Sequence, residues 1–285
     1  MKPPTLDYVA PTSLDEAVEA LSSPGAVVLA GGQSLVLELA YRDSRPGRLV
    51  DLNGVPGLDG LAEDEDGLTI GALVRHRTLE ARADQTSPSP YRQLLAQIAP
   101  YVAHPPIRAR GTFCGSVAWA HPAAEWNAVC RAFDAEVHVT SARGSRMVTA
   151  GDWYVGDRRT SRADDELVTA VRLPALAPGT GLGFGEYRRT HASFAGVAVV
   201  AAVTTDAAGS VVGARLAVAA VADRPVRLDA LEASLVGVDV DEAPERVRAA
   251  DGLPGTEHEQ AVTAELAARA VEQAIDRAQG SGDGR

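Results

Sequence analysis

Two short glycine-bearing segments of the sequence carry the residue types that bind phosphate. Residues 30–34 read Ala-Gly-Gly-Gln-Ser, residues 111–116 read Gly-Thr-Phe-Cys-Gly-Ser, and each segment stands directly before an apolar stretch. Glycine lets backbone N–H groups approach an anion closely, and a hydroxyl or amide side chain adds a further donor. Either segment alone also fits a tight turn with no ligand, but together they favour a dinucleotide, whose diphosphate can be held from two sides. Neither reads Gly-x-Gly-x-x-Gly, so a Rossmann fingerprint is absent.

A few single side chains could also do chemistry, and each has a structural alternative. His121 precedes Pro122 and fits either the cap of a helix that starts at that proline or a group that handles protons. Cys114 fits a small packed residue or, near a helix N-terminus, a thiol of lowered pKa. Cys130, in the middle of a predicted helix, fits the core.

The other candidate histidines and arginines are expected on the surface. They are His104, beside two prolines, and the neighbours Arg75 and His76. The pair Arg188-Arg189 fits a contact with a cofactor or a partner subunit, or a solvated strand end. No Ser-His-Asp order and no His-Glu-x-x-His spacing stands out, so the sequence supports neither a hydrolase nor a metal site.

Composition and charge argue against several classes of protein. With 285 residues, 46% of them hydrophobic and 23% charged, the chain can bury the core of one large or two smaller domains. The net charge of −11 argues against a nucleic-acid surface. No apolar run reaches the roughly 18 residues of a membrane span, and residues 1–17 lack the apolar core of a signal peptide, so we expect a cytoplasmic protein. Two cysteines are too few for a disulfide framework or an iron–sulfur cluster, so any iron partner in redox chemistry must lie on another chain.

Patterning in the first half of the chain predicts alternating helices and strands. Ser13 and Glu16 have capping-box spacing, which places the first helix at 13–22. Strands are predicted at 26–30, 48–52 and 67–73, and helices at 34–42, 77–83 and 91–103, the last closed by Pro105 and Pro106.

The second half is richer in strands. A helix from Pro122 to about residue 133 is followed by a predicted hairpin of residues 136–140 and 145–150 and by a strand at 165–174. The composition shifts at 177–183, where we expect a domain boundary. Beyond it we predict two long apolar strands, two helices and a disordered tail, at 193–206, 210–223, 227–237, 257–278 and 279–285. The sequence thus predicts an α+β N-terminal domain and a smaller α+β C-terminal domain.

Four segments resemble, in order, the FAD-binding medium subunits of molybdenum hydroxylases of the carbon monoxide dehydrogenase and xanthine dehydrogenase type. They read AGGQSL at 30–35, RGTFCGSVAWAHPAAEWNAV at 110–129, DELVTAVRLP at 165–174 and GFGEYRRTHASFAGVAVV at 183–200. The resemblance covers nearly the whole chain. It implies an FAD-binding domain of the vanillyl-alcohol oxidase / p-cresol methylhydroxylase type at 1–176, with α+β subdomains at about 1–55 and 56–176. It also implies the small α+β C-terminal domain of the carbon monoxide dehydrogenase flavoprotein type, at 177–285.

The resemblance implies which residues contact FAD. In the first loop, Gly31 and Gly32 would let the chain pass closely against the diphosphate, and Gly32, Gln33 and Ser34 would donate to phosphate. The complete set of expected cofactor contacts is Val28, Leu29, Ala30, Gly31, Gly32, Gln33, Ser34, Leu35, Val102, Thr112, Cys114, Gly115, Ser116, His121, Glu125, Val168, Glu186 and Phe194. The second loop would be formed by Thr112, Gly115 and Ser116.

Four of these positions have a more specific expected role. Glu125 takes the place of a carboxylate that binds FAD, and Val168 takes that of a backbone contact to the flavin. Phe194 falls where an aromatic residue lies near the isoalloxazine ring. Glu186 falls where members of the family place a lysine or a glutamate at the flavin. His121 and Glu186 are the expected catalytic residues.

The sequence departs from the family pattern at three places near the expected cofactor. Cys114 replaces the first glycine of the usual Thr-Ile-Gly-Gly, and its side chain is expected to crowd the diphosphate. Trp119 and His121 replace the histidine and aspartate of the usual His-x-Asp-Pro. Ala192 and Ser193 replace the Gly-Asp that precedes the late aromatic residue.

The resemblance implies an FAD subunit of a heterotrimeric complex. An iron–sulfur subunit would deliver electrons from a molybdenum-cofactor subunit, and the flavin would pass them to an external acceptor. The departures motivate an alternative, a stand-alone flavoenzyme in which a small substrate meets the flavin and His121 or Glu186 acts as acid or base. A third hypothesis is a subunit that has lost FAD and serves only in assembly.

Overall fold

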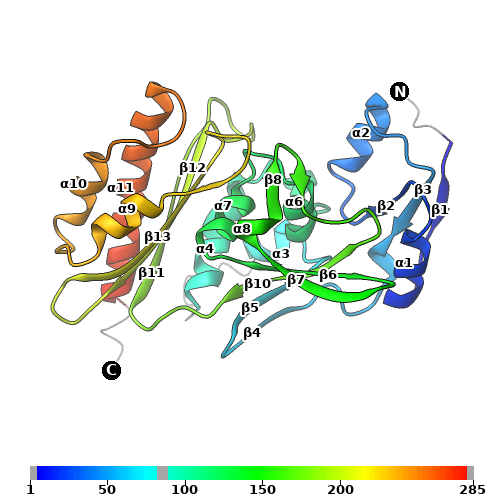
Figure 1. Cartoon of the computed structure of the whole chain (residues 1–285), viewed down its shortest axis with the longest axis horizontal. Helices are drawn as coiled ribbons and strands as arrows, with labels where there is room; N and C mark the ends of the chain where they lie inside the picture. Colours follow the sequence, from blue (N-terminus) through cyan, green and yellow to red (C-terminus); the bar gives the residue numbers. More distant parts are fainter. Residues whose placement is uncertain (1–4, 82–88, 281–285) are drawn as a thin grey trace.

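The computed structural model describes residues 5–81 and 89–280 and sets three β-sheets in a row along the long axis of the molecule (Figure 1). The first sheet is parallel, in the order β1-β3-β2, and lies at the N-terminal end. Its strands are β1 (Asp7–Val9), β2 (Ala26–Leu29) and β3 (Arg48–Asp51), and the connecting helices are α1 (Leu14–Leu21), α2 (Leu35–Tyr41) and the 3-10 turn η1 (Leu52–Gly54). Strand β1 escaped sequence prediction because it is only three residues long.

The capping box that predicted the first helix is present at the start of α1. The Ser13 side chain accepts a hydrogen bond from Glu16 N at 3.2 Å. The Glu16 carboxylate reaches back to Thr12 N at 2.8 Å. These contacts satisfy amides that the first turn of a helix leaves free, while Ala17 and Leu21 bury the opposite face.

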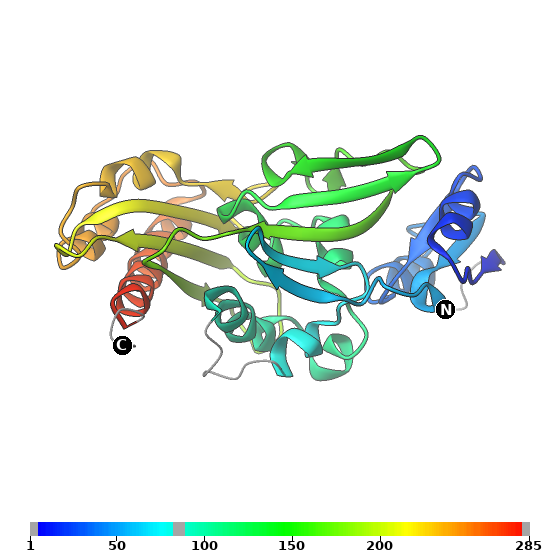
Figure 2. The ribbon, with the colours of Figure 1, turned by 90° about the horizontal axis from the view of Figure 1, so that it is seen from below.

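The middle sheet is antiparallel, in the order β4-β5-β10-β6-β7, and Figure 2 shows it between the other two sheets. Its strands are β4 (Leu61–Asp64), β5 (Gly67–Gly71), β6 (Glu136–Ser141), β7 (Gly144–Thr149) and β10 (Leu167–Pro174). The helices around it are α3 (His76–Ala81), α4 (Pro90–Ile98), η2 (Ala99–Tyr101), α5 (Pro105–Arg108), α6 (Phe113–Trp119), α7 (Glu125–Ala132) and α8 (Ala150–Trp153). A small two-stranded ribbon joins β8 (Tyr154–Gly156) to β9 (Arg159–Thr160).

Two predicted helix boundaries in this region are wrong. The helix predicted from Pro122 begins at Glu125, because residues 122–124 form a turn that the Asn127 side chain holds by donating to His121 O at 2.8 Å. The helix predicted at 91–103 ends at Ile98 and continues as η2, since Pro100 has no N–H to continue the α-helical ladder. The next two prolines start the short helix α5. Residues 82–83 of the helix predicted at 77–83 lie outside the described residues.

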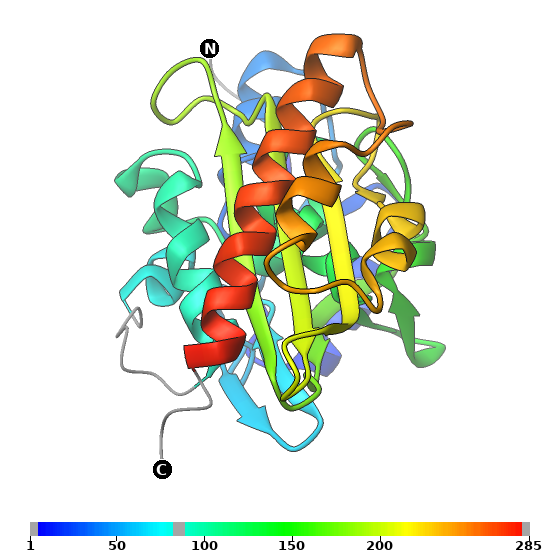
Figure 3. The same ribbon diagram turned by 90° about the vertical axis from the view of Figure 1, so that its left-hand side faces the viewer.

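The third sheet is antiparallel and is covered on its outer face by helices. Its strands are β11 (Thr180–Tyr187), β12 (Val197–Thr205), β13 (Val211–Ala219) and β14 (Val226–Arg227), and its helices are α9 (Asp229–Leu235), α10 (Ala243–Arg248) and α11 (Glu257–Gly280). Figure 3 shows α11 running across the strands. Along β12, Val199 and Ala201 pack beneath these helices, whereas Val200 and Ala202 join the core of the middle sheet. The third sheet is therefore buried on both faces.

The glycine-rich stretch predicted as a boundary turns into strand at Thr180. Every second residue of β11 from Gly181 to Gly185 is glycine, and α11 lies directly against that face. A Cβ on Gly181 would lie 1.9 Å from Ala274 O, and one on Gly183 would lie 1.9 Å from Ala270 O. The alternating glycines of β11 therefore allow the backbone of α11 to pack closely against the strand. The predicted tail begins inside α11, and residues 281–285 lie outside the described part.

Candidate functional site

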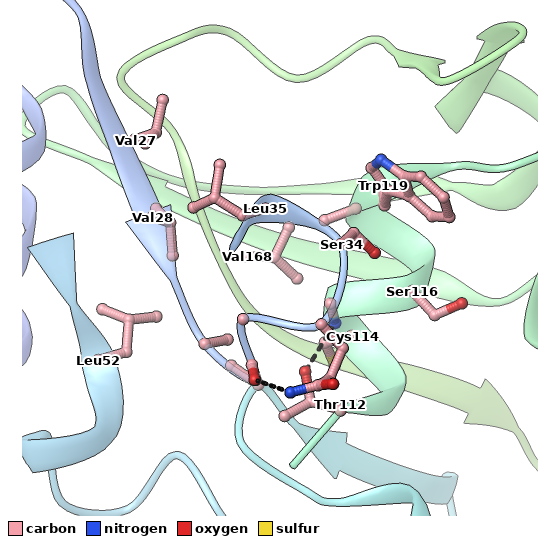
Figure 4. A pocket seen from close by; sticks show the side chains of 18 of the residues that line it. Val27, Val28, Ser34, Leu35, Leu52, Thr112, Cys114, Ser116, Trp119 and Val168 are labelled. Carbon is pink, nitrogen blue, oxygen red and sulfur yellow. Dashed lines mark hydrogen bonds between the residues drawn. The ribbon is translucent and has the colours of Figure 1, made fainter. Parts of the chain in front are cut away.

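One cavity lies between the loop that follows β2 and the start of α6 (Figure 4). It encloses about 1020 Å³ of space free of atoms, part of it open to solvent. Both glycine-bearing segments line it. The predicted cofactor contacts that line it are Val28, Ala30, Gly31, Gly32, Gln33, Ser34, Leu35, Thr112, Cys114, Gly115, Ser116 and Val168.

The structure requires glycine at both adjacent positions of the first loop, but for a different reason at each. A Cβ on Gly31 would lie 2.4 Å from Arg110 O and 2.7 Å from the Cα of Gly111, so the two loops touch backbone to backbone. Gly32 has a φ of +73°, which side-chain-bearing residues rarely adopt. The turn and the close contact therefore coincide at one wall of the cavity.

Unpaired backbone donors line the first loop. Within the described residues, the amides of Gly32, Gln33, Ser34 and Leu35 donate to no protein acceptor. Ser34 precedes α2 without capping it, which leaves its hydroxyl free as a further donor. The Gln33 side chain instead braces the loop, since its Nε2 donates to Gly31 O at 3.2 Å. Such a run of free N–H groups is a nest for an anion.

The second loop keeps fewer free donors than the sequence suggested. Thr112 caps α6 by accepting from Gly115 N at 3.0 Å, so that amide is used within the loop. Ser116 N bonds to Thr112 O as part of the helix start. The amide of Cys114 has no acceptor in the part of the chain that the structure describes.

A side-chain clamp joins the two loops. Asn53 Nδ2 donates to Ala30 O at 2.9 Å, and the Arg75 guanidinium donates both to the Asn53 side-chain oxygen and to Arg110 O. Arg75 was expected to be an ordinary surface residue. It instead fixes the separation of the loops.

The Cys114 side chain packs away into the protein. Its Sγ lies 3.3 Å from Ile70 O, and the residue is 2% exposed. Burial raises the pKa of this thiol well above its usual value, so the packed alternative holds and the reactive one does not. Because the thiol points toward Ile70, the side chain is not positioned to crowd a diphosphate, contrary to the expectation from the sequence.

Trp119 lines the cavity, and the rings of His121 and Phe194 lie against its ring. Trp119 Nε1 donates to the Glu38 carboxylate at 2.8 Å, which links α6 to α2. The ring of His121 stacks on both Trp119, with centroids 5.0 Å apart, and Phe194, at 4.0 Å, and the rings of Trp119 and Phe194 are also in contact. His121 Nδ1 accepts from Ala123 N at 3.2 Å, and burial lowers the pKa of this ring. His121 thus caps a turn, rather than a helix starting at Pro122.

A second cluster of predicted residues lies outside the walls of this cavity. Glu125, 5% exposed, and Glu186, whose side chain is 0% exposed, both have a raised pKa, to about 7 and about 8, with burial as the largest cause. Neither carboxylate oxygen of Glu186 has a hydrogen-bond partner among the described residues, and Arg188 Nε lies 3.8 Å away. Arg188 is itself tied to Tyr101 O at 3.0 Å. The predicted contacts that lie outside the cavity walls are Leu29, Val102, His121, Glu125, Glu186 and Phe194.

Sequence reasoning missed several residues that line the cavity. Arg162 is partly buried there, and its NH1 donates to the backbone oxygens of Ala163, Asp164 and Glu166. His76, expected on the surface, is 5% exposed because it follows β5 into the interior. No pattern in the neighbouring sequence predicts that either residue lines the cavity, since packing between distant segments places both of them there.

The chain shows no sign of a metal site or a membrane span where it is described. Over residues 5–81 and 89–280, no group of three or more His, Cys, Asp and Glu side chains could hold a metal ion. No helix within those ranges is both long and apolar enough to cross a bilayer.

The fold and the cavity define a mixed α and β protein that brings two glycine loops together without a Rossmann fingerprint. Residues 4–176 match the family described as "FAD binding domain in molybdopterin dehydrogenase". The chain belongs to this family of FAD-binding subunits of molybdenum hydroxylases, and it is an FAD-dependent oxidoreductase of the dehydrogenase type.

Similar proteins and structures span almost the same length. The 6-hydroxypseudooxynicotine dehydrogenase complex subunit alpha of Paenarthrobacter nicotinovorans is 37% identical over 83% of this chain and 79% of its own. Caffeine dehydrogenase subunit beta of Pseudomonas sp. (strain CBB1) is 34% identical over 97% of both chains. A chain of quinoline 2-oxidoreductase from Pseudomonas putida 86 has a TM-score of 0.84 at 32% identity, with 99% of each chain covered. A chain of reconstituted CO dehydrogenase from Oligotropha carboxidovorans has a TM-score of 0.87 at 29% identity, with 97% of this chain and 100% of its own covered.

Proposed function

We propose that this chain holds FAD with its diphosphate between the loops at 30–34 and 112–116 and passes electrons from an iron–sulfur subunit to an external acceptor. It would do so in the cytoplasm, in a heterotrimeric complex with that subunit and a molybdenum-cofactor subunit. The observation that carries the proposal is the meeting of both glycine loops at one cavity. The relatives support it, since their names describe subunits or medium chains of dehydrogenases.

The residues at the cavity fit a diphosphate. The amides of residues 32–35 and the Ser34 hydroxyl supply neutral donors, which favour an anion without the cost of burying several cations. Arg162 adds one positive charge at the cavity wall, where the two lining carboxylates are engaged, Glu38 by Trp119 and Glu166 by Arg146. In a chain of net charge −11, this local concentration of donors makes the cavity suited to an anion.

The acidic cluster fits the other end of the cofactor. A buried carboxyl without a hydrogen-bond partner is costly, and a ligand that brings N–H or O–H donors removes that cost. Glu186 would meet the isoalloxazine edge and Glu125 the hydroxyls of the ribityl or ribose. Phe194, 56% exposed, would present its ring near the flavin, with His121 behind it.

The arrangement of sheets supports the domain division implied by the resemblance. We assign residues 1–176 to an FAD-binding domain of the vanillyl-alcohol oxidase / p-cresol methylhydroxylase type, with subdomains at about 1–55 and 56–176. The first sheet ends at Asp51 and the middle sheet at Pro174, which agrees with those limits. Residues 177–285 would form the C-terminal domain, which shares its inner face with the middle core.

FAD, when bound, supplies the redox chemistry, because it takes up and releases electrons singly or in pairs. The protein positions it and holds protons beside it. Glu186 is protonated below a pH of about 8, so its carboxyl can donate a proton or a hydrogen bond at neutral pH. Cys114 and Cys130 are both buried, and neither is placed to ligate a cluster at the surface. The electron donor therefore belongs to another chain.

Reduction of the isolated, FAD-loaded chain tests the electron route. Small metabolites of the kinds named for the relatives, caffeine and carbon monoxide among them, should leave the flavin absorbance unchanged when no iron or molybdenum is present. Addition of the iron–sulfur and molybdenum subunits together with the right substrate should bleach it. Rapid bleaching by a metabolite in the isolated chain would contradict the subunit role and support the stand-alone flavoenzyme.

A further inference from the structure

His76 is a buried polar residue at the cavity that the proposed FAD contacts do not include. It is the first residue of α3, only 5% exposed, and it lines the cavity with the two glycine loops. Burial of an imidazole is unfavourable unless its ring nitrogens have hydrogen-bond partners.

The proton position on the His76 ring is set by Trp126. The indole Nε1 donates to His76 Nδ1 at 3.0 Å, and the two rings stack with centroids 5.9 Å apart. A nitrogen that accepts this bond carries no proton, so in the neutral ring the proton resides on Nε2. Burial, followed by the charges of Arg108 and Arg75, lowers the pKa of His76 to about 3, and the ring stays neutral at physiological pH.

The Nε2 edge of the ring lies against the base of the second loop. A Cβ on Gly111 would lie 2.8 Å from both Nε2 and Cδ2 of His76, and His76 N donates to Gly111 O at 3.0 Å. No residue in the described ranges accepts a hydrogen bond from Nε2. Although Nε2 has no acceptor within those ranges, it is not fully buried and keeps some solvent-accessible surface. The Nε2–H group of His76 is therefore a neutral donor of fixed orientation that lies beside the second loop.

We propose that His76 is a diphosphate-binding residue whose Nε2–H donates to an oxygen of the FAD diphosphate. This inference rests on the proposed function, because it takes FAD as the occupant of the cavity. The second loop has lost free donors to its own helix cap, with Gly115 N bonded to Thr112, and His76 restores one on that side. A charged acceptor makes such a hydrogen bond stronger than one between neutral groups.

Two substitutions separate hydrogen bonding from packing. His76→Phe keeps a flat ring of similar size and removes the donor. His76→Gln places an amide Nε2 close to the position of the imidazole Nε2 and keeps a donor. The exposed His104 provides the matched control, His104→Phe. Far-UV circular dichroism and melting of the apoproteins check that each variant folds.

The measurement is the dissociation constant of FAD by flavin fluorescence, with ADP and adenosine as competitors. His76→Phe should weaken FAD and ADP by about 10- to 100-fold, the range for a hydrogen bond to a charged group. Binding of adenosine, which has no phosphate, should not change. His76→Gln should recover most of the loss, and His104→Phe should bind like the parent. A parent protein that binds FAD while His76→Phe binds FAD and ADP equally well would overturn the inference alone.

The histidine proton provides a readout that does not require a variant. Nitrogen-15 NMR of the parent protein should show the Nε2–H tautomer for His76, and its resonance should shift on addition of ADP and stay in place with adenosine. A resonance of the Nδ1–H tautomer, or one that ADP leaves unmoved, would also overturn the inference. A parent that takes up no FAD at all would instead contradict the proposed function.

Discussion

Gly31 and Arg110 bring the two glycine loops into direct backbone contact. A Cβ on Gly31 would sit 2.4 Å from Arg110 O, far inside any allowed separation. The contact explains why the first loop needs a glycine even before a ligand is considered. It also means that the cavity wall is one unit built from segments about 80 residues apart.

Replacement of Gly31 by alanine should therefore disturb both folding and cofactor binding. Because the new methyl group meets backbone rather than a flexible side chain, we expect Gly31→Ala to lower the free energy of unfolding by about 1–3 kcal/mol. Urea unfolding of the apoprotein measures this. Gly60→Ala is the matched control, since its nearest neighbour lies 3.9 Å from the added carbon, and it should change little. Equal stability of the two variants would contradict the contact.

Gly32→Val should abolish FAD binding for a reason that combines strain and contact. The φ of +73° disfavours any side chain, and the new Cβ would meet Leu29 and Val36 at 3.2 Å. The loop that presents the free amides must then change shape. Flavin content after purification in excess FAD measures the effect, and a normal content would show that this loop is only a turn.

The buried carboxyl of Glu186 should make apoprotein stability depend on pH. Its pKa is raised from 4.5 to about 8 in the folded protein, with burial as the largest cause and Glu125 as the next. Between those two pH values the folded state holds a proton that the unfolded chain has released, so stability falls as pH rises through this window.

Glu186→Gln removes that titration and should make the apoprotein more stable than the parent at pH 8, with little difference at pH 5. Melting temperatures across this pH range give the comparison. Glu257→Gln, at an exposed position at the start of α11, is the control and should follow the parent. A parent whose stability does not fall between pH 5 and pH 8 would contradict the burial of a carboxyl that has no hydrogen-bond partner.

The bond between Trp119 and Glu38 should slow the release of FAD. It joins α6 to α2 across the cavity, and both residues line that cavity. Trp119→Phe should raise the dissociation rate of FAD by about three- to tenfold, as expected for the loss of one partly exposed hydrogen bond. A double-mutant cycle with Glu38→Ala, which removes the acceptor, tests the pair, since the second change should add little once the first is made. Additive effects would show that the two residues act separately.

Much of the fold was open to sequence reasoning because its signals are local. The capping box at Ser13 predicted α1, and two long apolar runs predicted the strands β12 and β13. The family and its cofactor followed from the order of four motifs, and the family match confirms them. The two glycine loops were predicted as a pair, although their contact through Gly31 was not.

The residues that sequence reasoning missed depend on contacts between distant segments. His76 and Arg75 sit in a charged stretch that looks solvated, yet the first is buried on Trp126 and the second clamps the loops. The glycines of β11 looked like a linker because the helix that requires them lies about 90 residues later in the chain. Cys114 looked intrusive in a loop, but its thiol turns toward the backbone of β5. None of these relationships leaves a pattern in neighbouring residues.

The most direct test of the account is titration of the apoprotein with FAD. The chain should take up a single FAD without a covalent bond, turn yellow, and release the cofactor on acid denaturation. ADP should compete for the same cavity, and Gly32→Val should show no uptake. A well-folded parent protein that remains colourless in excess FAD would contradict the central claim.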